Sequence, residues 1–306
     1  MNAIKYFKAL SDETRLRLLH LLLHHELKVG ELVSVLDMGQ SRISRHLKIL
    51  AEAGLVDSLK EGVWGLYFAV KGGPGRAFID SIQYLLKKDP VLQADLVQAA
   101  QVIEERRLTT QRFFSTIANS WELLKQEILG DFDLNQIIVN DMNNPAVAAD
   151  LGCGTGDLLE RMAPRAGKLI GVDSAPGMLA RARKRFDDSD KRIEVRLGEL
   201  EHLPLGNSEV DLAVVSLVLQ YLEKPAAAIA EAARVIRPDG HFILADFERH
   251  RQSDLREKYG ARWLGFDTEE VTQWLASNGF VLAALDRHPL EQGLAVNVFQ
   301  CRRQAV

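Results

Sequence analysis

A glycine-rich stretch near the middle of the chain constrains the fold more than any other feature. Residues 147–156 read Val-Ala-Ala-Asp-Leu-Gly-Cys-Gly-Thr-Gly, an apolar run that ends at Asp150 and is followed by three alternating glycines: Gly152, Gly154 and Gly156. A helical pattern begins directly afterwards at Asp157. Glycine lets the backbone approach a ligand where a Cβ atom would collide. The stretch therefore predicts a strand, a tight turn and a helix, the first unit of a ligand-binding α/β sheet.

The spacing of these glycines restricts the ligand. A second apolar run, 168–172, ends in Asp173, at the distance where an acidic partner of a ribose is usual. A dinucleotide fingerprint would need a glycine at position 157, but Asp157 stands there and would face a diphosphate unfavourably. S-adenosylmethionine carries a ribose and a carboxylate but no phosphate, so we expect it, or S-adenosylhomocysteine, as the cofactor. An oxidoreductase that uses NAD and a plain turn without a ligand are the alternatives.

Length and composition indicate two globular domains. The chain has 306 residues, of which 47% are hydrophobic, and its net charge is −4. The first 90 residues hold 13 Lys and Arg against 10 Asp and Glu, which gives +3, so the remainder carries −7. The two cysteines, Cys153 and Cys301, cannot build a disulfide framework. We expect a cytoplasmic protein that is not inserted in a membrane, because no signal peptide or long apolar run is present.

Helical and strand patterns divide the chain into three segments. Short helices and a hairpin fill residues 1–89, one or two long helices fill a linker at 90–130, and strands alternate with helices over 131–306. Strands are expected at 147–151, 169–172, 193–197, 212–216 and 241–246, with a closing antiparallel pair at 281–286 and 295–301. This alternation predicts a seven-stranded, mostly parallel sheet with helices on both faces.

The first segment has the order of elements of a winged helix-turn-helix. Two short helices, a turn at 37–39, a third helix at 40–53 and a hairpin over 55–70 follow one another. The polar residues that we expect to contact DNA are Gln40, Ser41, Arg42, Ser44, Arg45, His46 and Lys48 on the third helix and Lys60 near the hairpin tip. Gln and Arg can pair with purine edges, whereas Ser and Lys suit phosphates. The alternative is a solvated helix whose polar face happens to be basic.

This first segment resembles the ArsR-type (SmtB-like) bacterial repressors. The matching stretches are 9–19, reading Ala-Leu-Ser-Asp-Glu-Thr-Arg-Leu-Arg-Leu-Leu, 41–50, reading Ser-Arg-Ile-Ser-Arg-His-Leu-Lys-Ile-Leu, and 53–56. The resemblance covers about residues 1–88. It implies a homodimer, held by the first and last helices of the domain, on an inverted-repeat DNA operator.

The metal sites of these repressors lack their ligands in this chain. The thiolate site of the family is usually Glu-Leu-Cys-Val-Cys-Asp-Leu, but Lys28 and Gly30 replace its two cysteines. A second site uses Asp-x-His, and here Asp80 is followed by Ile82. We therefore expect no metal. Val63 stands where an arginine is frequent in the wing, so a minor-groove contact there is not expected.

The residues from about 110 to 306 resemble class I S-adenosylmethionine-dependent methyltransferases, in the subgroup that includes quinone-biosynthesis enzymes. The resemblance implies a Rossmann-like fold in which Asp150 and the backbone of Gly152 and Gly154 hold the methionyl end and Asp173 holds the ribose. Gly156 belongs to the same cofactor-binding loop. The resemblance further implies adenosine contacts from Met178, Glu199 and Leu200, a floor at Ser216, and a covering aromatic at Trp121. The alternatives are an ordinary exposed acid for Glu199 and plain core packing for Trp121.

Catalysis leaves little trace in the sequence, because methyl transfer depends on positioning and exclusion of water more than on a strong acid or base. The residues expected on the acceptor side are Gln220, Tyr221, Asp246, Glu248 and His250, and we assign none of them a proton-transfer role. Gln220 stands where the subgroup carries a histidine, and a glutamine cannot act as a base. The cysteines of arsenic methyltransferases are absent.

Two functional hypotheses follow. In the first, the chain is a transcriptional regulator whose methyltransferase-like body binds S-adenosylmethionine or S-adenosylhomocysteine as an effector. In the second, it is an active methyltransferase on a small molecule, and the first segment serves localisation, dimerisation or autoregulation. Because one protein can do both, we leave enzymatic activity undecided at this point.

Overall fold

The structure is a computed structural model that describes residues 2–61, 64–186, 192–252 and 254–304, with the backbone alone at residues 2, 59–61, 64–65, 254, 256–257 and 292. The chain divides into two compact units, Met1–Leu108 and Thr109–Val306. Among the described residues, no helix combines the length and the apolar character that crossing a bilayer requires.

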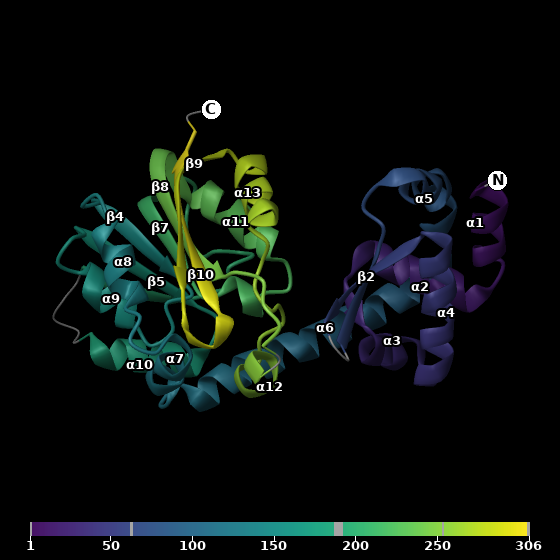
Figure 1. The fold of residues 1–306 in the computed structure, drawn as a ribbon, viewed down its shortest axis with the longest axis horizontal. Coiled ribbons are helices and arrows are strands. Elements are labelled where there is room, and N and C mark those ends of the chain that lie inside the picture. Colours follow the sequence, from purple (N-terminus) through teal and green to yellow (C-terminus); the bar gives the residue numbers. More distant parts are fainter. Residues whose placement is uncertain (1, 62–63, 187–191, 253, 305–306) are drawn as a thin grey trace. The chain divides into compact units, whose positions relative to one another are not determined.

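The first unit is a helical domain with a small sheet (Figure 1). Its helices are α1 (Asn2–Leu10), α2 (Glu13–His24), α3 (Val29–Leu36), α4 (Gln40–Ala53), α5 (Gly73–Leu86) and the first part of α6 (Pro90–Ile117). Strands β2 (Val56–Glu61) and β3 (Trp64–Ala69) form the predicted hairpin. A two-residue strand, β1 (Leu27–Lys28), pairs with β3 and was too short to be predicted. The expected order of a winged helix-turn-helix is therefore confirmed.

Local sequence explains where the helices of this unit begin and end. Asp12 caps α2 by accepting a hydrogen bond from the backbone N–H of Arg15 at 3.1 Å. Gly54 ends α4 in the left-handed region, with φ 78°. The apolar residues of α2 and α4 meet in one core, whose fully buried members include Leu18, Leu19, Ile43, Leu47 and Leu50.

The beginning of α6 packs into the first unit. Ala99 is completely buried in its core. Arg17 of α2 donates two hydrogen bonds to Asp95, at 2.8 and 2.7 Å, and Arg106 pairs with Glu31 of α3 at 2.5 Å. The division between the two units, after Leu108, falls inside α6 and inside the range 90–130 that we expected to be a linker.

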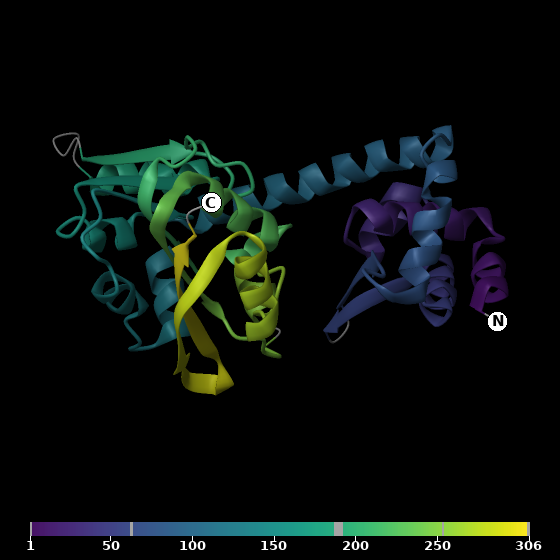
Figure 2. The ribbon, with the colours of Figure 1, turned by 90° about the horizontal axis from the view of Figure 1, so that it is seen from above.

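The second unit is built on a seven-stranded sheet with the order β6-β5-β4-β7-β8-β10-β9. The strands are β4 (Val147–Leu151), β5 (Lys168–Asp173), β6 (Ile193–Leu197), β7 (Val210–Ser216), β8 (Ile236–Phe247), β9 (Phe280–Pro289) and β10 (Ala295–Arg303). The first five are parallel to one another, and β10 is antiparallel to both β8 and β9. The β9–β10 hairpin lies at one end of the sheet (yellow in Figure 2). The predicted mostly parallel fold is confirmed.

Helices cover both faces of this sheet, as buried parallel strands require (Figure 1). The helices of the unit are the end of α6, α7 (Trp121–Leu129), α8 (Leu134–Asn140), α9 (Asp157–Met162), α10 (Pro176–Arg185), α11 (Pro225–Val235), α12 (Asp254–Tyr259) and α13 (Thr268–Ser277). One core includes Leu134 of α8 and Leu159 of α9, and the other includes Ile229 of α11 and Leu275 of α13. The bounds of β4 and β6 agree with the predicted ones. Strand β8 begins five residues earlier than the predicted 241, because residues 237–240 bulge out of its pairing with β7.

Candidate cofactor site and nucleic-acid interface

Four neighbouring strands deliver most of the predicted cofactor residues to one edge of the sheet. Asp150 lies near the end of β4, Asp173 ends β5, Glu199 and Leu200 follow β6, and Ser216 ends β7. These strands are adjacent and parallel, in the order β6-β5-β4-β7. Ligands of open α/β sheets bind at the carboxyl ends of such strands. The structure therefore brings together residues that lie up to 66 positions apart in the sequence (216 − 150 = 66).

The glycine loop needs its glycines for two different reasons. Gly152, Gly154 and Gly156 all adopt positive φ, at 90°, 53° and 84°. A Cβ atom at Gly152 would lie 2.4 Å from a methyl group of Val218, and one at Gly156 would lie 2.7 Å from the ring of Phe186. At Gly154 the nearest atom would be Nε1 of Trp121, at 3.6 Å. The outer two glycines thus allow close packing, while the middle one faces the aromatic side chain on α7.

Asp173 fixes the shape of this loop. Its Oδ2 accepts a hydrogen bond from the N–H of Gly154 at 2.9 Å, and its Oδ1 accepts one from the N–H of Ala175 at 2.8 Å. Burial raises the pKa of the Asp173 carboxyl, and these two amides partly oppose the shift. A carboxylate oxygen can accept more than one hydrogen bond, so Asp173 keeps capacity for the hydroxyls of a ribose.

Asp150 is an acid buried beneath the loop, with only 2% of its surface exposed. Burial raises the pKa of its carboxyl to about 7, because the charged form loses its hydration. The positive charge of Lys125 opposes this shift, and the negative charges of Asp173 and Asp157 add to it. Perturbed acids of this kind are typical of functional sites.

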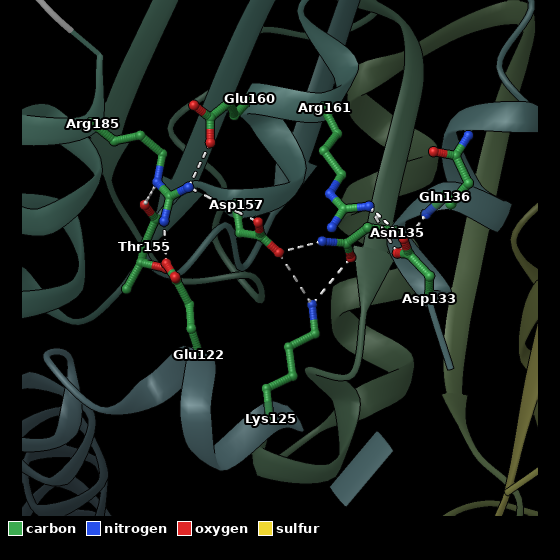
Figure 3. Close-up of polar contacts among 10 residues, drawn as sticks. All are labelled: Glu122, Lys125, Asp133, Asn135, Gln136, Thr155, Asp157, Glu160, Arg161 and Arg185. Atoms are coloured by element: carbon green, nitrogen blue, oxygen red, sulfur yellow. Dashed lines mark hydrogen bonds and ion pairs between the residues drawn. The ribbon is translucent and has the colours of Figure 1, made fainter. Parts of the chain in front are cut away.

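A polar network that the sequence did not indicate joins α7 to the loop (Figure 3). Glu122 accepts a hydrogen bond from Oγ1 of Thr155 at 3.1 Å and pairs with Arg185 of α10. Arg185 also binds Glu160 at 2.6 Å and the backbone oxygen of Thr155 at 3.2 Å. Arg161 of α9 pairs with Asp133 at 2.7 Å. The partners lie 25 to 63 residues apart, so no local motif announces them.

Lys125 occupies the middle of this network. Its Nζ donates to Oδ1 of Asn135 at 3.1 Å and lies 4.0 Å from Oδ2 of Asp157. Asn135 in turn donates to Asp157. Burial lowers the pKa of Lys125, and the charges of Asp157 and Asp150 counteract that shift.

Trp121 and Met178 lie together beside the loop. Met178 forms a small core with Ala118 and Ala175, against which Trp121 packs. The Trp121 ring contacts Phe114 edge to face at 5.5 Å, and Phe114 contacts Tyr221 at 4.7 Å. Trp121 therefore packs against this small core and also borders the loop at Gly154.

The residues expected on the acceptor side have different surroundings. Oγ of Ser216 is buried without a hydrogen-bond partner in the described part of the chain. Asp246 is buried and accepts hydrogen bonds from the N–H groups of Leu219 and Phe247, at 2.9 and 2.8 Å. Burial raises the pKa of Asp246 to about 7. These two amides give Asp246 a structural task at the start of the segment that follows β7.

The remaining acceptor-side residues are held by the backbone or by ion pairs. The backbone oxygen of Gln220 accepts from the N–H groups of Arg262 and Trp263, at 2.8 and 3.0 Å. Glu248 pairs with Arg287 at 2.7 Å. Nδ1 of His250 accepts from the N–H of Gln252 at 3.1 Å. Burial raises the pKa of Tyr221 far above its ordinary value.

At the expected adenine end, Leu200 is buried, while Glu199 is half-buried and forms a β-bridge with His202.

In the first unit, α4 presents a polar face to solvent. Exposed residues on it are Gln40, Ser41, Arg42, Ser44, Arg45 and Lys48. The expectation of exposure was wrong for His46, whose side chain is only 12% exposed and whose Nδ1 lies 3.7 Å from Asp12. The backbone of Lys60 belongs to β2, but its side chain lies outside the described residues, as do Gly62 and Val63.

No three His, Cys, Asp or Glu residues in the described ranges are grouped as ligands of a metal ion. Glu31, in the stretch that corresponds to the thiolate site of the repressors, instead binds Arg106 and the N–H of Lys28.

Comparison with known proteins identifies both units. A family model for bacterial regulatory proteins of the ArsR family matches residues 12–58, and a methyltransferase-domain model matches residues 149–244. The chain joins an ArsR-type domain to a methyltransferase domain. The matched ranges contain α4 and the glycine loop with Asp173, respectively.

The curated relatives of this chain have different descriptions. An uncharacterized 37.1 kDa protein in transposon TN4556 of Streptomyces fradiae is 35% identical over 153 residues, which are 49% of this chain and 43% of that protein. The malonyl-[acyl-carrier protein] O-methyltransferase of Hahella chejuensis is 30% identical over 178 residues, 56% of this chain and 60% of that enzyme. The alignments thus span about half the length of these curated relatives.

A solved structure supports the fold of the methyltransferase domain. One chain of the Haloferax volcanii complex that contains the Trm112 methyltransferase activator aligns with a TM-score of 0.52 and 19% identity. The alignment covers 61% of this chain and 96% of that one. At this identity, the likeness concerns the fold alone.

Proposed function

We propose that this protein is a DNA-binding transcriptional regulator whose methyltransferase domain binds S-adenosylmethionine or S-adenosylhomocysteine, as an effector or as a methyl donor. The observation that carries the proposal is the convergence of Asp150, the glycine loop and Asp173 on adjacent strand ends, in a chain whose ArsR-type domain exposes a basic helix face.

The residues of the pocket fit an adenosyl amino acid. Asp150 and the loop would hold the methionyl end, and Asp173 the ribose. Glu199, Leu200 and Met178 would surround the adenosine, and Trp121 would cover it. The unpartnered hydroxyl of Ser216 fits a polar ligand at the floor. When bound, S-adenosylmethionine supplies an electrophilic methyl group, and the protein contributes orientation and exclusion of water.

The ArsR-type domain would bind double-stranded DNA as a homodimer. Gln40, Arg42 and Arg45 are exposed on α4, where they would reach base edges in the major groove. Ser41, Ser44 and Lys48 would contact phosphates. His46 is less suited to this role, because its ring packs toward Asp12.

Helix α6 offers a physical route from cofactor to DNA affinity. Its beginning is fixed to the ArsR-type domain by Asp95, Ala99 and Arg106. Its end carries Phe114, which contacts Trp121, and Ser115, whose Oγ accepts from the N–H of Gly177 at 3.2 Å. A ligand that reorders α7 and α10 would therefore act on a helix that both domains share.

DNA binding with and without the nucleosides tests this proposal. An operator is first selected from random duplexes with the full chain, and its affinity is then measured while S-adenosylmethionine or S-adenosylhomocysteine is titrated. Allosteric coupling of about 1–3 kcal/mol predicts a change of about 5- to 150-fold. Failure to select any operator, or an affinity that stays flat through cofactor saturation, contradicts the regulatory proposal.

An active methyltransferase is the second candidate, and its support is the likeness to malonyl-[acyl-carrier protein] O-methyltransferases. In this case the acceptor would be a small molecule or a carrier-bound acyl group, and the ArsR-type domain would serve dimerisation or autoregulation. Transfer of a labelled methyl group from S-adenosylmethionine into a metabolite of an extract, abolished by Asp173→Ala, supports it. No transfer in extracts from varied growth conditions counts against it.

A further inference from the structure

We infer that Lys125 recognises the carboxylate of the ligand's amino-acid end, so that the site selects nucleosides that carry a complete amino acid. This inference rests on the proposed function and adds a specificity residue to the same pocket. It begins from a lysine on α7 that neither the glycine loop nor the strand ends could indicate.

The geometry leaves the Lys125 ammonium group able to bind a further partner. A lysine has three N–H donors. Within the described part of the chain, Asn135 takes one of them at 3.1 Å, and Asp157 at 4.0 Å lies beyond hydrogen-bond distance. The side chain is 22% exposed, so it is held in a sheltered position and still reaches solvent or ligand.

The negative charges around the glycine loop favour a cation at this place. Asp150 and Asp157 lie in or beside the loop and suit the cationic amino group of S-adenosylmethionine, and Asp173, which would hold the ribose, adds a further negative charge nearby. The carboxylate of the same ligand would be repelled by these acids unless a positive charge faced it.

The other cations drawn in Figure 3 are already occupied by close ion pairs. Arg185 binds Glu122 and Glu160, and Arg161 binds Asp133. Lys125 has no carboxylate partner closer than 4.0 Å among the described residues. Among the three cations of this network, Lys125 is therefore the one that a ligand carboxylate would stabilise most.

The position of Lys125 on α7 supports the same conclusion. Trp121 and Lys125 are four residues apart and thus share one face of the helix. Trp121 borders Gly154 of the loop, and Lys125 is close enough to oppose the pKa shift of Asp150. One helix would therefore cover the nucleoside with an aromatic ring and bind its amino-acid end with a cation.

Ligands that differ only at the amino-acid end test the inference. The full-length protein and its Lys125→Gln and Lys125→Arg variants are titrated calorimetrically with three ligands: S-adenosylhomocysteine, its decarboxylated analogue and 5′-methylthioadenosine. Lys184→Gln serves as the matched control, since Lys184 is an exposed residue on α10. Thermal melting of each variant reports whether it is folded.

We expect Lys125→Gln to weaken the binding of S-adenosylhomocysteine about 10-fold or more, as for loss of a charge-assisted hydrogen bond. The affinities for the two ligands without a carboxylate should stay unchanged. Lys125→Arg should retain most of the affinity, and Lys184→Gln all of it. If Lys125→Gln weakened the binding of all three ligands equally, Lys125 would have a structural role and the inference would be overturned. Unchanged affinity for S-adenosylhomocysteine in this variant would overturn it as well. If the unaltered protein binds none of the nucleosides, the proposed function itself fails, and the inference fails with it.

Discussion

A carboxyl group buried as deeply as that of Asp150 makes the pocket sensitive to pH. Its pKa is raised from 3.8 to about 7, so in the folded protein it stays protonated over a range in which the unfolded chain has already released the proton. The sign follows directly: between about pH 4 and pH 7, the stability of the ligand-free protein falls as pH rises through this group. A cationic ligand reverses the preference, because it favours the ionised carboxylate.

We therefore predict that the affinity for S-adenosylhomocysteine rises from pH 6 to pH 8. Binding of the ligand's amino cation is expected to drive the proton off Asp150, so the increase approaches at most about tenfold per pH unit below pH 7. Calorimetric titrations at several pH values measure it. The Asp150→Asn variant should bind S-adenosylhomocysteine more weakly, and its affinity should no longer depend on pH between pH 6 and pH 8. If the affinity of this variant still rose with pH as in the unaltered protein, another group would be responsible.

Gly152 and Gly154 lie in the same loop but have different surroundings, so the stabilities of their alanine variants can be compared. Gly152→Ala places its Cβ 2.4 Å from Val218, whereas Gly154→Ala meets nothing nearer than Trp121 at 3.6 Å. Both variants bear the strain of positive φ, which is larger at 90° than at 53°, so strain and steric clash act in the same direction at Gly152. We predict that Gly152→Ala lowers the free energy of unfolding by about 1–3 kcal/mol more than Gly154→Ala, measured by urea denaturation. Similar losses would show that Val218 moves aside easily.

At the scale of elements, the pair between Arg17 and Asp95 is one of the contacts that attach helix α6 to the first unit. Asp95 is 5% exposed, so removing its charge leaves Arg17 without its partner in a largely buried place. We predict that Asp95→Ala costs about 2–4 kcal/mol of stability by chemical denaturation. The exposed pair between Arg76 and Asp80 is the control, and Asp80→Ala should cost less than about 0.5 kcal/mol. Equal costs would mean that Asp95 does not anchor α6.

The sequence predicted the elements that short-range patterns specify. Strand 147–151 and helix 40–53 have the observed bounds, because the strand is apolar apart from Asp150 and a C-cap glycine ends α4. The sequence could not predict that the first part of α6 packs into the first unit. The hydrogen bonds from Arg17 to Asp95 that help to attach it join residues far apart in the sequence. Strand β1 has only two residues and no pattern of its own.

The candidate site shows the same limit. Asp150, Asp173 and the loop could be found because each follows an apolar strand at a characteristic spacing. Lys125 and Glu122 could not, because their partners come from α8, α9 and α10, and only tertiary packing brings these helices to α7. His46 was misplaced because its position on the polar face of α4 does not disclose the neighbouring Asp12.

At the scale of the whole molecule, apolar side chains remain uncovered on the ArsR-type domain. Phe7 of α1 and Leu85 of α5 are 62% and 71% exposed, and Ile4 and Tyr84 lie beside them in sequence. Such exposure is unfavourable in a monomer and is typical of an interface between subunits. We predict a dimer by light scattering, converted to a monomer by Phe7→Glu combined with Leu85→Glu, with a loss of operator affinity. Val281→Glu, on the exposed part of β9, is the control and should leave the dimer intact.

One calorimetric experiment tests the central claim, that the loop after β4 accepts an adenosyl amino acid and no dinucleotide. The full-length protein is titrated with S-adenosylhomocysteine and, in parallel, with NAD. The account predicts saturable binding of one S-adenosylhomocysteine per chain, lost in Asp173→Ala, and no binding of NAD, because Asp157 would face its diphosphate. Binding of NAD in preference to S-adenosylhomocysteine, or binding of neither, would contradict it.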